Sequence, residues 1–200
     1  SMPQDFGSYV MENILFKISF PAEFHAQTAA EAAVTLHPHV KARLEEVDRI
    51  VITTHESAIR IISKQGKLAN AADRDHCLQY MTAVPLIFGS LTAEHYEDSF
   101  HQANPVIDSI REKMEVVEDE RYTREYLEED KRSIANAIQV FFKDGSSTDK
   151  VAVEYPIGHR RRRKDGIPLL EDKFYNNLAT RFPGQRCEQI FRLCKDQKAL

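Results

Sequence analysis

A lysine and a histidine stand close together near the start of the sequence, in the segment KISFPAEFHAQTAAEAA over residues 17–33. Lys17 and His25 have the types and spacing of a cation and an imidazole that bind one anionic ligand. His25 falls at the start of a predicted helix, where free backbone N–H groups attract carboxylates and favour a neutral imidazole. A neutral imidazole is what a general base needs. The plain alternative is a surface lysine and a histidine that caps the helix.

A second candidate is a run of basic side chains after residue 158. His159 precedes five cations in a row, which are Arg160, Arg161, Arg162, Arg163 and Lys164. Adjacent cations repel one another, so such a run either faces solvent or binds anions. A solvated loop and a clamp for a tricarboxylate or a phosphate are both compatible with it. Nucleic-acid binding is disfavoured because the run has no interleaved aromatic residues and no RNP-like motif.

Other polar residues have plain structural explanations. Tyr80 could place a phenol in a cleft, but it stands beside an apolar helical stripe, which favours a packed tyrosine. His55 and Glu56 could orient a proton carrier or could lie at a strand bend. His37 and His39 flank a proline without a nearby carboxylate or cysteine set, so no metal site is predicted there.

The composition limits the classes of protein to consider. The chain has 200 residues, 42% of them hydrophobic and 29% charged, with a formal net charge of -4. These values predict one globular domain, or two small ones, and not a general polyanion binder. The apolar runs are too short to predict a membrane-spanning helix, and the N-terminal residues lack the charged and apolar regions that would predict a signal peptide. The first two residues, Ser1 and Met2, are typical of a cloning remnant, so we expect a piece of a longer protein.

The cysteines and the absent motifs narrow the chemistry further. Cys77, Cys187 and Cys194 are widely spaced and form no CxxC motif, which predicts reduced thiols in an intracellular protein and no iron–sulfur cluster or structural zinc built from them. We expect no cofactor. The sequence also lacks GxGxxG, P-loop, GxSxG and HExxH motifs, which argues against nucleotide enzymes and serine hydrolases.

Hydrophobic periodicity, caps and prolines predict the secondary structure. The predicted elements are a strand over 14–20, a helix over 26–41, one or two strands over 47–63, a helix over 74–88 capped by Asp73, a short helix over 91–98 capped by Thr92, a helix from Pro105 to about Val117, a solvated connection over 118–132, a β-hairpin over 135–155, a helix from Pro168 and a last helix over 187–194. Strands and helices mix without a regular βαβ alternation. The sequence therefore predicts an α+β fold, with a mixed or antiparallel sheet and a β-hairpin packed against several helices.

Several long segments resemble one known family. The segments FGSYVMEN, KISFPAEFHAQTAAEAA, VITTHESAIRIISK, DRDHCLQYMTAVPLIFGSLTAEHYED and VEYPIGHRRRR are similar to the 2-methylcitrate dehydratases of the MmgE/PrpD superfamily, nearly from end to end. The resemblance implies a large helical domain and a smaller α+β lid, with the active site between them. Residues 1–200 would be the C-terminal lid domain, and the helical N-terminal domain would be absent.

The resemblance also implies an activity. The whole enzyme would be a hydro-lyase of the methylcitrate cycle in propionate catabolism, converting 2-methylcitrate to 2-methyl-cis-aconitate without an iron–sulfur cluster. It would be a homodimer, cytoplasmic in a bacterium and mitochondrial in a eukaryote, with no membrane partner. The isolated piece would be inactive, because further acid and base residues belong to the helical domain. The alternative is a non-catalytic module that binds an anion or RNA through its basic run.

The resemblance assigns roles to particular residues. Lys17 resembles the family's lysine before a Phe/Tyr-Pro motif, although one extra residue intervenes here. The family's lid histidine aligns with Glu23 if no gap is allowed, but we favour His25, which can carry a proton near neutral pH. Tyr80 matches an active-site tyrosine of the family. His159 and the arginines Arg160, Arg161, Arg162 and Arg163 would hold substrate carboxylates. We expect Lys17, His25 and Tyr80 to lie on an open face.

Overall fold

This computed structural model describes residues 18–196. The described chain divides into two compact units, one formed by residues 20–156 and the other by residues 18–19 and 157–196. Each unit is described by itself below.

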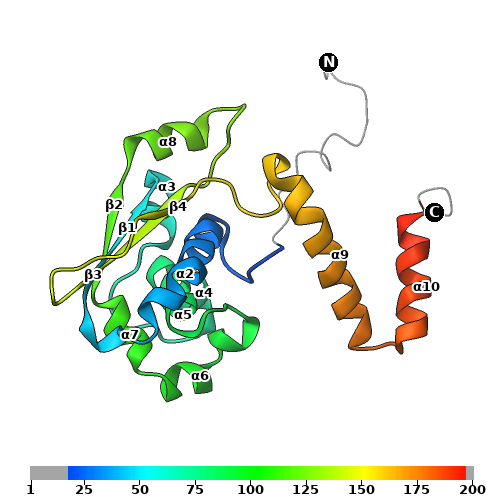
Figure 1. Ribbon diagram of the computed structural model, residues 1–200, viewed down its shortest axis with the longest axis horizontal. Helices are drawn as coiled ribbons and strands as arrows, with labels where there is room; N and C mark the ends of the chain where they lie inside the picture. The colour runs from blue at the N-terminus through cyan, green and yellow to red at the C-terminus, as the bar shows by residue number, and fades with distance from the viewer. Residues whose placement is uncertain (1–17, 197–200) are drawn as a thin grey trace. The chain divides into compact units, whose positions relative to one another are not determined.

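The larger unit is built on a four-stranded mixed sheet with the strand order β2-β1-β3-β4 (Figure 1). Its strands are β1 (Val47–Thr54), β2 (Met114–Glu118), β3 (Asn136–Phe142) and β4 (Val151–Val153). The central strand β1 runs parallel to β2 and antiparallel to β3, and β3 continues into β4 as an antiparallel hairpin. The mixed sheet and the hairpin confirm the predicted α+β fold.

The remaining regular elements of the larger unit are helical. The helical segments of the larger unit are η1 (Phe24–Ala26), α2 (Gln27–Val40), η2 (Leu44–Glu46), α3 (Glu56–Ile62), α4 (Ala71–Asp75), α5 (Leu78–Phe88), η3 (Ala93–Tyr96), α6 (Asp98–Ala103), α7 (Val106–Arg111) and α8 (Glu120–Leu127). None of the helices between residues 18 and 196 is both long and apolar enough to span a membrane.

Helix α2 is the centre of the core. It contacts β3 and β4 of the sheet and also contacts α5. Alanines at positions 29, 30, 32 and 33 are completely buried in these contacts. Because an alanine side chain ends at Cβ, both neighbours can approach the helix closely. The alanine-rich segment after His25 therefore packs on several sides at once.

The smaller unit contains η4 (Arg160–Arg162), α9 (Arg163–Ala179) and α10 (Gly184–Lys195). Figure 1 shows α9 and α10 side by side, joined by a short connection. Aromatic side chains join the two helices, since the ring of Phe191 lies 6.1 Å from that of Phe174 and 6.3 Å from that of Tyr175. Helix α9 begins at Arg163, before the predicted start at Pro168, and includes this proline.

The structure corrects the predictions for several segments. Residues 14–17 of the first predicted strand lie outside the described residues, and residues 18–20 are not in a strand. The second half of the predicted strand over 47–63 is helix α3. Its buried residues Ala58 and Ile62 are four positions apart, so the helical period overrides the β preference of its isoleucines.

The predictions for the helix after Pro105 and for the charged segment over 118–132 are also wrong. The helix after Pro105 ends at Arg111, and Met114 begins strand β2, because this segment pairs with β1 as the edge of the sheet. The charged segment over 118–132 contains α8, whose residue Tyr122 is buried. Charged residues outnumber apolar residues in this segment, so its composition does not reveal the one apolar face of the helix.

Candidate active site

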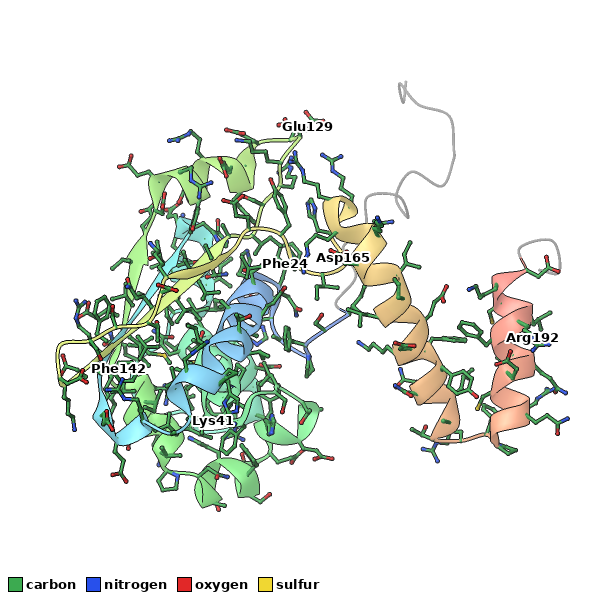
Figure 2. The ribbon with its side chains drawn as sticks, viewed as in Figure 1. Phe24, Lys41, Glu129, Phe142, Asp165 and Arg192 are labelled. Carbon is green, nitrogen blue, oxygen red and sulfur yellow. The ribbon has the colours of Figure 1, made fainter. Side chains whose placement is uncertain are left out.

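A carboxylate and an imidazole pair at the start of α2. Glu23 caps η1 by accepting a hydrogen bond from the backbone N–H of His25 at 2.8 Å. The same carboxylate lies 3.0 and 3.1 Å from Nδ1 of the His25 ring. Phe24, labelled in Figure 2, marks this end of α2, and its ring meets the His25 ring edge to face at 5.3 Å. The carboxylate that a helix start attracts is thus supplied by the chain itself.

Two further rings lie against His25. The Tyr126 hydroxyl lies 3.2 Å from His25 Nε2, and the His55 ring lies 5.2 Å from the His25 ring. His55 also stacks on Tyr126, with 4.7 Å between ring centroids and 18° between planes. Residues far apart in sequence, from the ends of η1, β1 and α8, therefore form one cluster. We call Glu23, His25, His55 and Tyr126 the histidine cluster.

Within this cluster His55 is neutral at physiological pH. Its side chain is fully buried, and burial lowers the pKa of His55 to about 4, with a positive charge on His25 acting in the same direction. The backbone of Ala135 acts in the opposite direction, but no hydrogen bond of ordinary geometry reaches His55 Nε2 in the described part of the chain. A neutral ring at this place packs against Tyr126 as a flat, uncharged surface.

The first residue of β3 fixes the backbone beneath the cluster. The Asn136 side chain donates one hydrogen bond to the backbone carbonyl of His25 and another to Thr28 Oγ1, each at 2.8 Å. The Thr28 hydroxyl in turn donates to the carbonyl of Ile134. Both Thr28 and Asn136 are completely buried. The start of α2 is therefore tied to the sheet by a buried hydrogen-bond network, which holds His25 in place.

This arrangement suits proton transfer. An ionised Glu23 can only accept hydrogen bonds, so the proton of a neutral His25 belongs on Nδ1. His25 Nε2 is then an acceptor, and the Tyr126 hydroxyl donates to it. When His25 is protonated, the Glu23 carboxylate balances the charge of the ring, and Nε2 becomes a donor toward the same hydroxyl. Both states keep their hydrogen bonds, as a residue that passes protons requires.

The structure does not join Tyr80 to the histidine cluster. Tyr80 is completely buried, and its hydroxyl donates to the backbone carbonyl of His95 at 2.6 Å. Its ring packs near Tyr96 and meets His101 edge to face. Burial raises the pKa of Tyr80 to about 12. The expectation of an open face is therefore wrong for Tyr80, and also for His25, of which only 6% is exposed.

The basic run belongs to the smaller unit and lies in helical segments, not in a loop. His159 caps η4 by accepting the backbone N–H of Arg161 at 3.2 Å. Arg162 forms a long ion pair with Asp165, at 3.9 Å. The remaining members, Arg160, Arg163 and Lys164, lie in the same continuous stretch of η4 and the start of α9. This run therefore presents its cations along helical turns.

Some members of the site can be found from sequence and others cannot. Lys17 lies outside the described residues. The helical pattern places His25 at the start of a helix, and His55 stands at the end of an evident strand. Tyr126 and Asn136 were missed, because a tyrosine in a charged segment and an asparagine that begins a strand give no signal of a shared site. Only the packing of α8 and β3 brings them to His25.

Comparison with known proteins gives a consistent set of relatives. A family model described as the MmgE/PrpD C-terminal domain matches residues 20–197. A 2-methylcitrate dehydratase of Escherichia coli K12 is 54% identical over 198 residues, which cover 98% of this chain and 41% of that protein. A mitochondrial 2-methylcitrate dehydratase of Yarrowia lipolytica is 55% identical over 188 residues, covering 92% of this chain and 36% of that protein.

A more distant relative agrees with them. A 2-methylcitrate dehydratase-like protein of Aspergillus oryzae is 40% identical over 195 residues, covering 94% of this chain and 39% of that protein. The chain thus spans about two fifths of the length of the curated relatives that it matches.

Proposed function

Because this chain belongs to the MmgE/PrpD C-terminal domain family, we propose that it is the C-terminal part of a hydro-lyase that removes water from 2-methylcitrate or a related tricarboxylate. The observation that carries this proposal is the 54% identity with a bacterial 2-methylcitrate dehydratase over 98% of the chain. The rest of the enzyme would be a helical domain with further acid and base residues, and the complete protein would be a homodimer. It would act in the bacterial cytoplasm or in mitochondria, according to its source.

The chemistry of the proposed reaction matches the side chains of the histidine cluster. Dehydration breaks a C–H bond and a C–O bond, so it needs a base for the carbon-bound proton and an acid for the leaving hydroxyl. In this proposal His25 serves the proton transfers, and its partner Glu23 keeps it in one orientation. The second acid or base residue would come from the helical domain.

The substrate carboxylates need cations. We propose that Lys17, His159 and the arginines of the basic run bind them, since a guanidinium grips a carboxylate with two parallel hydrogen bonds. The sequence resemblance also supports Tyr80 as a site residue. For Tyr80 to act on substrate, its hydroxyl would have to leave the carbonyl of His95, so we propose that it acts only after such a rearrangement.

A chimeric enzyme tests the proposed function. The matched 198 residues of the Escherichia coli enzyme are replaced by this chain, and turnover is followed by the ultraviolet absorbance of the new conjugated double bond. We expect the chimera to dehydrate 2-methylcitrate and the isolated 200-residue chain to show no turnover. A folded chimera without activity, or an active isolated chain, would contradict the proposal.

A binding measurement tests the alternative module. If the basic run binds RNA, the affinity of the isolated chain should fall linearly on a plot of log affinity against log salt, because each phosphate contact releases counterions. If the basic run instead binds the carboxylates of a substrate, the chain should prefer citrate-like ions to monocarboxylates. Tight RNA binding with this salt dependence, and no preference among carboxylates, would favour the alternative.

A further inference from the structure

The rings of the histidine cluster are arranged in order of exposure. Tyr126 is partly exposed, whereas His25 behind it is 6% exposed and His55 is completely buried. The hydroxyl of Tyr126 lies 3.2 Å from His25 Nε2, and no other described residue forms a hydrogen bond with it. Among the three rings of the cluster, that of Tyr126 therefore belongs to the residue most accessible from solvent.

We propose that Tyr126 is a catalytic residue of the dehydration, and that its hydroxyl donates the proton to the departing hydroxyl group of the substrate. His25 then acts through Tyr126 by replacing that proton, and Glu23 is a positioning residue for His25. This inference rests on the proposed function and adds to it the group that touches the substrate.

The proton balance is complete within the proposed reaction. A base on the helical domain takes the carbon-bound proton, and the electron pair of that C–H bond forms the new C=C bond. The C–O bond breaks with its electron pair on oxygen, which receives the proton of Tyr126 and leaves as water. Tyr126 takes the Nε2 proton of the His25 imidazolium, which becomes neutral. Exchange with solvent restores the starting protonation state.

Two contacts hold this relay in a reactive geometry before substrate binds. The Glu23 carboxylate engages both the backbone N–H and Nδ1 of His25, so the ring cannot turn over without losing a hydrogen bond. The stacked His55 ring covers one face of Tyr126 and limits rotation of the phenol. Catalytic groups that are already oriented need less reorganisation during the reaction.

Ion pairs hold the helix that carries Tyr126. Arg121 bonds to Glu125 on the same helix at 3.0 Å and to Glu154 beyond β4 at 2.8 Å. Lys131 adds a second cation to Glu125 at 2.9 Å. Helix α8 is thereby tied to the segment after β4 and to its own C-terminal loop. This anchoring fixes where the Tyr126 hydroxyl lies relative to His25.

A kinetic experiment in the active chimera tests the role of Tyr126. Tyr126→Phe keeps the ring that stacks on His55 and removes only the hydroxyl. We expect kcat to fall about 100-fold with little change in KM, because an acid that acts in the transition state is lost. The matched control is Tyr122→Phe on the same helix, which should leave kcat unchanged.

The pH profile separates catalysis from structural damage. The titratable groups that face His25 are Glu23 from the segment before α2, His55 from the end of β1 and Tyr126 from α8. A proton supplied by His25 makes kcat decline on the basic side of the profile. In Tyr126→Phe that decline should disappear, since the residual reaction no longer uses the relay. An unchanged kcat, or a reduced kcat with the same basic decline, would overturn the role of Tyr126.

A spectroscopic experiment on the 200-residue chain tests the relay without turnover. Nitrogen-15 NMR of neutral His25 should place the proton on Nδ1. Tyr126→Phe should move the chemical shift of Nε2 toward the value of an imidazole nitrogen that accepts no hydrogen bond. Tyr122→Phe should leave this signal in place. A proton on Nε2, or an Nε2 signal insensitive to Tyr126→Phe, would overturn the relay. An inactive chimera would instead count against the proposed function.

Discussion

A single carboxylate decides what the His25 ring can do. Glu23 stands two residues before His25 and accepts hydrogen bonds from its backbone and from Nδ1. The opposite edge of the ring is left to Tyr126. Because Nδ1 is bonded to Glu23 and Nε2 faces the Tyr126 hydroxyl, the imidazole can exchange protons only through Nε2. The neighbouring His55 serves a different purpose, since burial keeps it uncharged.

The buried His55 should make the protein sensitive to mild acid. Its native pKa of about 4 lies below the value of 6.5 for an unperturbed histidine, so the unfolded chain binds the proton more readily. Between pH 6.5 and 4, this histidine should lower the free energy of unfolding by about 1.4 kcal/mol for each pH unit of acidification. Above pH 6.5 it should have no pH-dependent effect.

Urea unfolding of the wild type and of His55→Gln at several pH values checks this prediction. The difference in unfolding free energy between the two proteins should change across pH 4 to 6.5 and stay constant above that range. Parallel stability curves throughout would show that His55 titrates alike in the folded and unfolded chains.

At the scale of elements, local patterns predict structure where one face of a segment carries the signal. The alanine-rich helix after His25, the hairpin of β3 and β4, and the capped turn at Thr92 all follow from periodicity or turn chemistry. Helix α3 and strand β2 do not follow, because isoleucine and valine fit both a strand and a buried helix face. Pairing with β1 selects a strand for β2, and packing of the buried face selects a helix for α3.

The close packing of α2 gives a prediction for its alanines. Ala33→Leu adds three carbon atoms at a completely buried position of a helix that contacts both the sheet and α5. We expect a loss of about 1–3 kcal/mol in unfolding free energy from overpacking. Thr35→Leu on the exposed side of the same helix is the control and should change stability by less than about 0.5 kcal/mol. Equal losses, measured by urea unfolding, would contradict the packing argument.

At the scale of the whole molecule, the proposed functional groups are divided between the two units. The histidine cluster and Tyr80 belong to residues 20–156, and the basic run belongs to the unit that includes residues 157–196. Sequence motifs could identify both regions because each contains unusual residue types close together. They could not identify the relay, since His25 and Tyr126 are separated by 101 positions and meet only after the sheet has formed.

The turnover number of His25→Ala in the chimera tests the central claim most directly, because His25 supplies the proton that Tyr126 passes to the substrate. His39→Ala, at the exposed end of α2, is the matched control. With circular dichroism and thermal unfolding showing that both variants are folded, we predict that His25→Ala lowers kcat by roughly 100-fold or more and that His39→Ala leaves it unchanged. A folded His25→Ala enzyme with the kcat of the unmodified chimera would contradict the account.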